Sequence, residues 1–356
     1  MNSAAEGFAS RLGATLVEGP LQGYHHEAYA VRLDATSQLG RQFPFLKLRE
    51  PRPGVFWYDL RYFRSEDQLL TFLQRWVPRI PQVAQVVESF SVHSFIEGRT
   101  LAAIRRETPD RDIPESYVRQ IEELFGRLAA VDVQALERAE MPTYVEPTYG
   151  KDSTAFLRRL VEHTISGVYD PLRSTFEEIF NAFGVPEDGL HIFLKNLDPL
   201  DERPYQLLHC DLHCDNFVVD GDGLLWTIDW ELAQIGDPLY DLATHLHLMA
   251  YSESQEVEMV KRWQRALEVV RPGATVGLAD DLPKYRDYKC IQSVYTDIIR
   301  GATAVRTNRS LAAARVAARS IESSMRRAQG VLGLQDAPSA NLVGRVLIEW
   351  SQSQPG

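Results

Sequence analysis

Short apolar runs dominate roughly the first 95 residues of the chain. Residues 28–33 (AYAVRL) and 43–48 (FPFLKL) are brief and rich in β-branched or aromatic side chains, which predicts β-strands. Residues 83–98 (VAQVVESFSVHSFIEG) predict two further strands around a turn. This part of the chain is therefore expected to form a small sheet.

One helical pattern lies among these strands, at residues 64–77. Its apolar side chains recur at three- and four-residue spacing, and Ser65 precedes them as a suitable N-cap. The side chains expected on its buried face are Leu69, Leu70, Leu73 and Trp76.

After Gly98 the pattern changes to amphipathic helices. The segments with this spacing are 116–133, 152–165, 172–183, 239–251, 256–270, 288–306 and 311–332. The predicted fold class is therefore α+β. We expect a small β-rich N-terminal lobe over 1–95, a connector over 96–101 and a larger, mainly helical C-terminal lobe over 102–356.

One β-like segment interrupts the helical part, at residues 207–246. The run FVVDGDGLLWTID predicts a β-hairpin, because two apolar strands flank Asp-Gly-Asp-Gly. With a loop at 220–223, Val219 would face Leu224. Such a hairpin would gather Asp211, Asn216 and Asp229 at its open end.

The composition of the chain indicates the kind of compartment in which it works. The chain has 356 residues and three cysteines, which argues against a disulfide framework and for a reducing compartment. The N-terminus does not resemble a signal peptide, and no apolar run is long enough to span a bilayer. We therefore expect a cytoplasmic protein with no membrane partner.

The net charge of −11 is unevenly distributed. Residues 96–296 carry 20 basic and 36 acidic side chains, whereas residues 1–95 carry 10 and 9. An acidic field repels nucleic acid and attracts cations, so no nucleic-acid partner is expected. Acidic surfaces also serve solubility alone, and the composition does not distinguish these two uses.

The densest chemistry lies in HCDLHCDN, residues 209–216. His209, Cys210, His213 and Cys214 suggest a zinc site, but structural zinc sites pair two separate ligand clusters and only one is present here. Asp211, Asn216 and Asp229 instead offer hard oxygen atoms, which suit Mg²⁺ together with phosphate. One carboxylate and one amide could hold the metal, which leaves the other carboxylate for a substrate hydroxyl.

Three motifs in order, HCDLHCDN, IDWE and GDPLYDLA, resemble those of the aminoglycoside phosphotransferase and choline kinase-like family. The resemblance implies a two-lobed protein-kinase-like fold and phosphoryl transfer from ATP or GTP with Mg²⁺. It implies Asp211 as the catalytic residue and Asn216 and Asp229 as the metal ligands. His209, His213 and Asp241 are expected to support the loop.

The same resemblance predicts nucleotide-binding residues upstream. Lys47 would meet the phosphates, Glu66 would hold Lys47, and the connector around Glu97 would meet the base. A solvated strand-end charge and a charge at a helix N-terminus are the alternatives for Lys47 and Glu66. The phosphate loop is expected within residues 18–33, although these contain few glycines.

Cys210 stands where the family usually has glycine, and Asp215 is an additional acid. Glu231 and Asp287 belong to the acidic region and are candidates for binding a cationic, hydroxylated acceptor. An aminoglycoside or another antibiotic fits this description. Choline, ethanolamine or a sugar, and a pseudokinase-like module that binds nucleotide without turnover, remain alternatives.

Overall fold

The structure is a computed structural model that describes residues 3–21, 23–87, 90–108, 112–145 and 150–354. The chain forms two compact units, each built from separate stretches. Residues 1–56, 61–149 and 205–274 form the first unit, and residues 57–60, 150–204 and 275–356 form the second. These compact units divide the chain at other positions than the lobe boundary expected at residues 95–102. That boundary stays a prediction.

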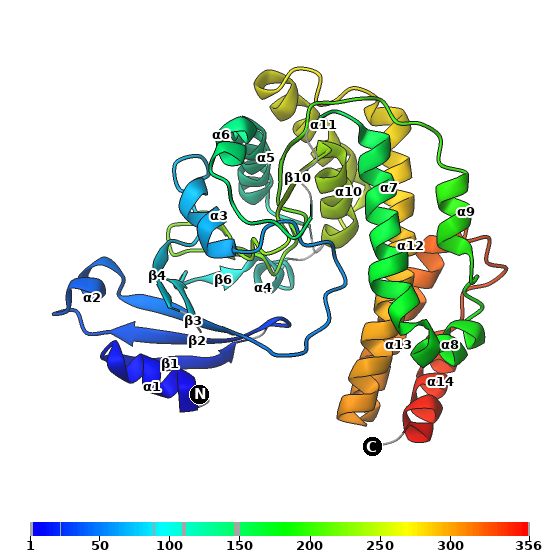
Figure 1. Cartoon of the computed structure of the whole chain (residues 1–356), viewed down its shortest axis with the longest axis horizontal. Helices are drawn as coiled ribbons and strands as arrows, with labels where there is room; N and C mark the ends of the chain where they lie inside the picture. The colour runs from blue at the N-terminus through cyan, green and yellow to red at the C-terminus, as the bar shows by residue number, and fades with distance from the viewer. Residues whose placement is uncertain (1–2, 22, 88–89, 109–111, 146–149, 355–356) are drawn as a thin grey trace. The chain divides into compact units, whose positions relative to one another are not determined.

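Among the described residues, five antiparallel strands form the largest sheet of the first unit, in the order β1-β2-β3-β5-β4 (Figure 1). Their bounds are β1 Ala14–Leu21, β2 His26–Leu33, β3 Phe45–Pro51, β4 Val83–Val87 and β5 Phe90–Ser94. The strands expected at 28–33, 43–48 and 83–98 are thus present. The turn expected between β4 and β5 includes residues 88–89, which lie outside the described residues.

The two faces of this sheet have different environments. One face is apolar and packs with α1 (Ser3–Arg11) in a core that contains Tyr29, Leu46, Leu48 and Val92. The other face carries charge, because Lys47 and Arg49 alternate with these leucines along β3. The basic side chains of β3 therefore lie on the face opposite this apolar core.

Helix α3 (Glu66–Leu73) matches the single helix expected in this region, although it is shorter. The hydroxyl of Ser65 accepts a hydrogen bond from the backbone of Gln68, as the N-cap pattern predicted. Leu69, Leu70 and Leu73 are buried, but Trp76 lies beyond the last turn. Two short helices, α1 and α2 (Gln38–Gln42), were not expected here.

The predicted hairpin is present as β8 (Phe217–Val219) and β9 (Leu225–Thr227). Its predicted register was wrong by one residue, because Val219 pairs with Leu225 and not with Leu224. The loop has five residues, since the carboxylate of Asp220 accepts hydrogen bonds from the backbone of Asp222 and Leu224. An Asx-type turn of this kind tightens the loop from within.

The remaining elements of the first unit surround this hairpin. They are α4 (Leu101–Arg105), α5 (Glu115–Ala130), α6 (Val133–Arg138), α10 (Pro238–Met249), α11 (Glu253–Val270), β6 (Arg99–Thr100), β7 (Gln206–Leu208) and β10 (Gln234–Gly236). Strand β6 extends the hairpin through β8, and β7 pairs with β10. Helix α10 begins at Pro238, and the side chain of Asp237 caps it, which explains the GDP in the sequence.

The described residues of the second unit form helices and their connecting segments, and no strand. Its elements are α7 (Ser153–His163), a π-helical segment (Thr164–Tyr169), α8 (Asp170–Ala182), α9 (Gly189–Lys195), α12 (Leu278–Asn308), α13 (Leu311–Ala328) and α14 (Ala340–Ser353). A buried ion pair between Arg203 and Asp281 lies within it. In the described part of the chain, no helix is both long and apolar enough to cross a membrane.

Candidate active site

The loop between β7 and β8 is shaped by a left-handed residue. Cys210 has φ of +66°, a conformation that favours glycine. The backbone N–H groups of His209 and Cys210 donate to Oδ2 and Oδ1 of Asp241, over 3.1 and 2.7 Å. The structure thus explains why a glycine commonly occupies this position in the motif, and it ties the loop to the first turn of α10.

His209 is buried beneath this loop, which lowers its pKa to about 4. Its Nδ1 accepts a hydrogen bond from the backbone of Asp211, so the neutral tautomer carries its hydrogen on Nε2. That hydrogen faces the carbonyl of Ile228, 3.2 Å away, and the ring packs edge-on against Trp230. His209 therefore joins the loop to the strand that precedes Asp229.

His245 on α10 has a similar position, which the sequence did not indicate. Its Nδ1 lies 2.9 Å from the carbonyl of Leu212, and its Nε2 lies 2.9 Å from the hydroxyl of Tyr251. The residue is fully buried, and burial lowers its pKa to about 4. His245 is thus a neutral support of the loop.

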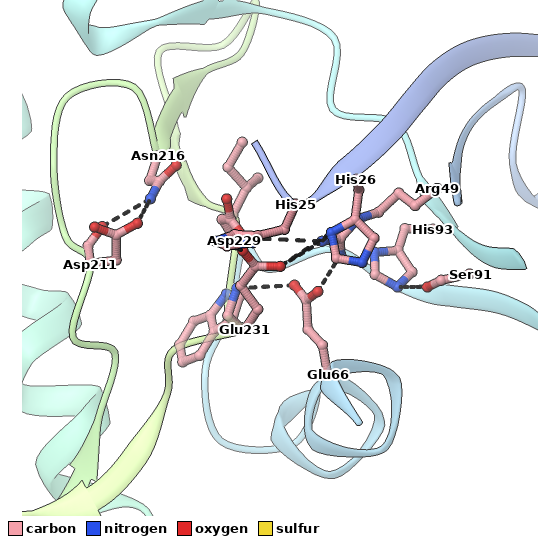
Figure 2. Close-up of polar contacts among 12 residues, drawn as sticks. His25, His26, Arg49, Glu66, Ser91, His93, Asp211, Asn216, Asp229 and Glu231 are labelled. Atoms are coloured by element: carbon pink, nitrogen blue, oxygen red, sulfur yellow. Dashed lines mark hydrogen bonds and ion pairs between the residues drawn. The ribbon is translucent and has the colours of Figure 1, made fainter. Parts of the chain in front are cut away.

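Asp211 and Asn216 lie side by side (Figure 2). The Nδ2 group of Asn216 donates to Oδ2 of Asp211 over 2.8 Å and to its backbone carbonyl over 2.9 Å. Both contacts use the amide nitrogen, so the amide oxygen faces away from Asp211. Asp211 is 27% exposed, and its Oδ1 accepts no hydrogen bond from any described residue.

His213 lies closer to the carboxylate than expected of a residue that only braces the loop. Its Nε2 is 3.5 Å from Oδ2 of Asp211, and its Nδ1 accepts from the backbone of Asp215 over 3.2 Å. Burial alone would lower the pKa of His213, but the contact with Asp211 raises it. His213 and Asn216 together hold one oxygen of Asp211 and leave the other available.

Asp229 follows β9 in a strained conformation, with φ of +66°. Its side chain is 39% exposed, and its Oδ1 accepts no hydrogen bond from the described residues. Partial burial and the neighbouring Glu66 raise its pKa, although Arg49 acts in the opposite direction. An oxygen atom held in this way is suited to bind a cation.

Arg49, and not Lys47, forms the ion pair with Glu66 (Figure 2). Its guanidinium also lies 3.5 Å from Glu231 and 4.0 Å from Asp229. Lys47 forms no ion pair with any described residue, so the expected contact with Glu66 is not present. Burial and the neighbouring Arg49 lower the pKa of Lys47.

Glu231 belongs to this group and is only 10% exposed. The Nδ1 of His26 lies 3.2 Å from one of its oxygens, and the Nε2 of His25 lies 3.9 Å from the other. Burial, together with Asp229 and Glu66, raises the pKa of Glu231 to about 9. Glu231, expected to bind an acceptor, therefore contacts the segment between β1 and β2 where the phosphate loop was expected; residue 22 lies outside the described residues.

Carboxylate oxygens of Glu66, Asp229 and Glu231 lie within 4.8 Å of one another. Such a group could hold a metal ion, but Arg49 already supplies a positive charge to it. The amide oxygen of Asn216 and the carboxylate of Asp229 are hard oxygen donors that accept no hydrogen bond from the described residues, so they fit Mg²⁺.

The connector lies between β5 and β6, and Glu97 is exposed there. Glu97 contributes to a hollow of about 270 Å³ whose lining also includes Phe45, Phe95 and Trp226. Asp287, the other acceptor candidate, is half-buried on α12 and belongs to the second unit. Burial raises its pKa.

The sequence interpretation missed Arg49, His25, His26 and His245. For Arg49 a signal existed, because a residue two positions from Lys47 on a strand shares its face. For His25 and His26, their position in the expected phosphate loop was the only sign, and for His245 there was none.

Residues 17–279 match the model of the phosphotransferase enzyme family, APH. The chain belongs to this family. The resemblance inferred from HCDLHCDN, IDWE and GDPLYDLA is thereby confirmed. Members of the family are phosphotransferases, and the match includes every candidate site residue described above except Asp287.

Solved structures agree on the fold. Macrolide 2'-phosphotransferase MphH from Brachybacterium faecium is 17% identical, with a TM-score of 0.52, and the match covers 89% of this chain and 97% of that one. Choline kinase from Cryptosporidium parvum Iowa II is 13% identical, with a TM-score of 0.52 and coverage of 99% and 100%. The expected protein-kinase-like fold is confirmed.

A third structure, aminoglycoside phosphotransferase APH(4)-Ia in a ternary complex with ADP and hygromycin B, is 14% identical. Its TM-score is 0.53, and the match covers 95% of this chain and all of that one. No curated protein sequence matches the chain. Identities this low support the fold and leave the acceptor open.

Proposed function

We propose that this phosphotransferase-family protein transfers the γ-phosphoryl group of ATP or GTP to a hydroxyl of a small molecule. The observation that carries the proposal is the geometry around Asp211. One of its oxygens is held by Asn216 at 2.8 Å, and the other accepts no hydrogen bond from the described residues while the side chain remains partly exposed. A carboxylate fixed in this way is ready to orient a hydroxyl.

The acceptor hydroxyl donates its hydrogen bond to Oδ1 of Asp211 and attacks the γ-phosphorus. The bond from that phosphorus to the bridging oxygen breaks, the nucleoside diphosphate leaves, and Asp211 takes the hydroxyl proton late. A loose transition state needs little activation of the nucleophile, so positioning and charge supply most of the acceleration. The contacts of Asn216 and His213 set the direction in which Asp211 presents its oxygen.

Asn216 and Asp229 are the residues that we propose to hold Mg²⁺. When bound, the ion neutralises charge on the phosphates. The orientation of Asn216 supports the assignment, because its amide nitrogen is committed to Asp211. Lys47 is the proposed phosphate ligand, since it lies among carboxylates and forms an ion pair with none of the described residues. The backbone of the connector near Glu97 is the proposed contact for the base.

For the acceptor we propose a cationic, hydroxylated molecule. The acidic balance of residues 96–296 supports this choice, and so does the half-buried carboxylate of Asp287. Hygromycin B in complex with a related fold is an example of a hydroxylated antibiotic. Antibiotic modification, a cytoplasmic location and the absence of a nucleic-acid partner remain parts of this proposal.

The test is a screen of hydroxylated acceptors with ATP and with GTP, in the presence of Mg²⁺, read by mass spectrometry. The expected result is a mass gain of one phosphoryl group on a cationic acceptor. Asp211→Asn should lower kcat by roughly 10²–10⁴-fold, with nucleotide affinity nearly unchanged. Asp215→Asn is the matched control, because Asp215 is 68% exposed on the same loop.

A pseudokinase-like module would bind nucleotide and give no mass gain with any acceptor. If Asp211→Asn retained the turnover of the unaltered protein, the assignment of Asp211 would be wrong even if transfer itself were observed. Omission of Mg²⁺ should abolish transfer, and its return should restore it.

A further inference from the structure

Two basic side chains project from one face of β3 toward the carboxylates. Lys47 and Arg49 are two residues apart, so they share that face. On the neighbouring strand β5, Lys47 pairs with His93 and Arg49 pairs with Ser91. Both are therefore candidates for Glu66, and the contacts decide which cation holds it.

Arg49 makes the contacts. It is 5% exposed and forms the ion pair with Oε2 of Glu66. The second oxygen of Glu66, Oε1, accepts a hydrogen bond from the backbone N–H of Trp230 over 3.0 Å. Since Trp230 follows Asp229, one carboxylate links β3, α3 and the segment that carries the proposed metal ligand (Figure 2).

Arginine suits this position better than lysine. The planar guanidinium presents several N–H donors in a fixed geometry, so it can contact more than one carboxylate. Here it meets Glu66 and also lies 3.5 Å from Glu231 and 3.2 Å from His26. A lysine ammonium has a compact charge and cannot span these partners in the same way.

We propose that Arg49 is the positioning residue that holds Glu66 and the Asp229 segment, and that Lys47 is thereby left to contact the nucleotide phosphates. The inference rests on the proposed function and deepens it. It assigns to two residues of one strand the two tasks that the sequence interpretation gave to Lys47 alone. Glu66 is then a structural bridge for Asp229 and not the partner of the phosphate-binding lysine.

The test is a pair of double-mutant cycles in the full chain, read as the Kd of Mg·ATP or Mg·GTP by calorimetry. The first cycle combines Arg49→Met with Glu66→Gln, and the second combines Lys47→Met with Glu66→Gln. In the first cycle the Kd of the double variant should be close to that of whichever single variant binds nucleotide less tightly. Its Kd should therefore differ by about tenfold or more from the product of the single effects.

In the second cycle the coupling should be several-fold weaker than in the first, because Lys47 forms no ion pair with Glu66. The opposite pattern, with coupling between Lys47 and Glu66 and independence of Arg49, would overturn the inference and leave the proposed phosphotransfer intact. If the unaltered protein bound neither nucleotide, both the proposed function and this inference would fail.

Two further measurements separate positioning from a loss of folding. Arg49→Ala should regain nucleotide affinity and turnover in millimolar guanidinium, whereas Lys47→Ala should not, and equal rescue of both would contradict the assignment. A third double-mutant cycle combines Arg49→Lys with Glu66→Gln and compares free energies of unfolding measured without nucleotide. It tests the contact between Arg49 and Glu66 directly. Independent effects in that cycle would also overturn the inference.

Discussion

The backbone N–H of Cys210 donates to Oδ1 of Asp241 over 2.7 Å, and this contact holds Cys210 at φ of +66°. Asp241 is buried on α10, and burial raises its pKa to about 6 despite two backbone donors. One side chain of a helix thus fixes the conformation of the loop that presents Asp211. The conformation is costly for a residue with a Cβ atom, by roughly 1–2 kcal/mol.

Cys210→Gly should therefore be tolerated, with a free energy of unfolding within about 1 kcal/mol of the unaltered protein. Relief of the left-handed strain offsets the entropy that glycine loses on folding. Cys210→Val should lower the free energy of unfolding by about 2 kcal/mol or more, because a β-branched residue is disfavoured at this φ. Urea denaturation measures both.

Cys214→Gly is the control, because Cys214 is half-buried nearby and does not have a positive φ. Cys214→Gly should lower the free energy of unfolding, because no left-handed strain is relieved there to offset the loss of the side chain. If Cys214→Gly and Cys210→Gly were equally destabilising, strain at Cys210 would not be a significant term.

Stability should fall in mild acid because His245 is buried in its neutral form. Its pKa is about 4 in the fold and about 6.5 in the unfolded chain, so the unfolded chain binds more protons between these values. The contribution is fully present above about pH 6.5 and is lost as the pH falls toward 4, by about 3 kcal/mol in total. Denaturation midpoints measured from pH 7 to pH 4 would reveal it.

His245→Gln should flatten this pH dependence relative to the unaltered protein, although it also lowers stability at pH 7. His247→Gln is the matched control on the same helix, because His247 is only partly buried. Equal slopes for His245→Gln and His247→Gln would show that another group titrates in this range.

The start of α3 is fastened to β5 by three polar side chains. His93 is 2% exposed, its Nε2 lies 2.6 Å from Oδ1 of Asp67, and the hydroxyl of Ser91 donates to the same oxygen over 2.5 Å. Because Asp67 follows Glu66, His93→Ala should weaken nucleotide binding through Glu66 and cost about 1–3 kcal/mol of stability. Calorimetry and urea denaturation would measure the two effects.

Ser91→Ala should have a smaller effect on both quantities, because the histidine contact remains. Thr71, on the same helix, is exposed and donates only to the backbone of Asp67, so Thr71→Ala is a control. Normal nucleotide affinity in His93→Ala would show that α3 does not need this attachment.

In the second unit the buried ion pair of Arg203 and Asp281 should contribute strongly to the free energy of unfolding. Arg203 is fully buried and also donates to the carbonyl of Val276 over 3.0 Å. Arg203→Met would remove the fully buried partner of Asp281 and leave it the partly exposed Lys284, 3.1 Å away, so the expected loss is about 3 kcal/mol, the lower end for breaking a buried pair. Thermal or urea unfolding would measure it.

Arg326→Met provides the comparison. Arg326 pairs with Glu322 along α13 and is 67% exposed, so this substitution should cost less than about 0.5 kcal/mol. A similar loss for both variants would mean that burial does not decide the strength of these pairs.

The hairpin and the proximity of its polar side chains could be predicted because they are local in sequence. Asp211, Asn216 and Asp229 lie within 19 consecutive positions, and two apolar strands around an Asp-Gly turn bring them together. The register was off by one residue because the side chain of Asp220, and not the backbone alone, closes the loop. Hydrophobic alternation does not report such a side-chain contact.

The partner of Glu66 could not be predicted in the same way. Lys47 and Arg49 share one face of β3, and the position of α3 relative to that strand decides between them. That position depends on contacts between segments far apart in sequence, such as Asp67 with His93. Helices α1 and α14 were also absent from the amphipathic runs identified in the sequence.

The two compact units are interleaved along the chain, since each consists of three separate stretches. All residues of the first unit have been synthesised once position 274 is reached, whereas residues 57–60 and 150–204 must wait for 275–356 before their own unit is complete. A cut at any single position therefore removes part of at least one unit. Fragments of this protein should therefore fold less stably than the whole chain. During synthesis, chaperones should bind mainly to residues 57–60 and 150–204, which precede the rest of their unit.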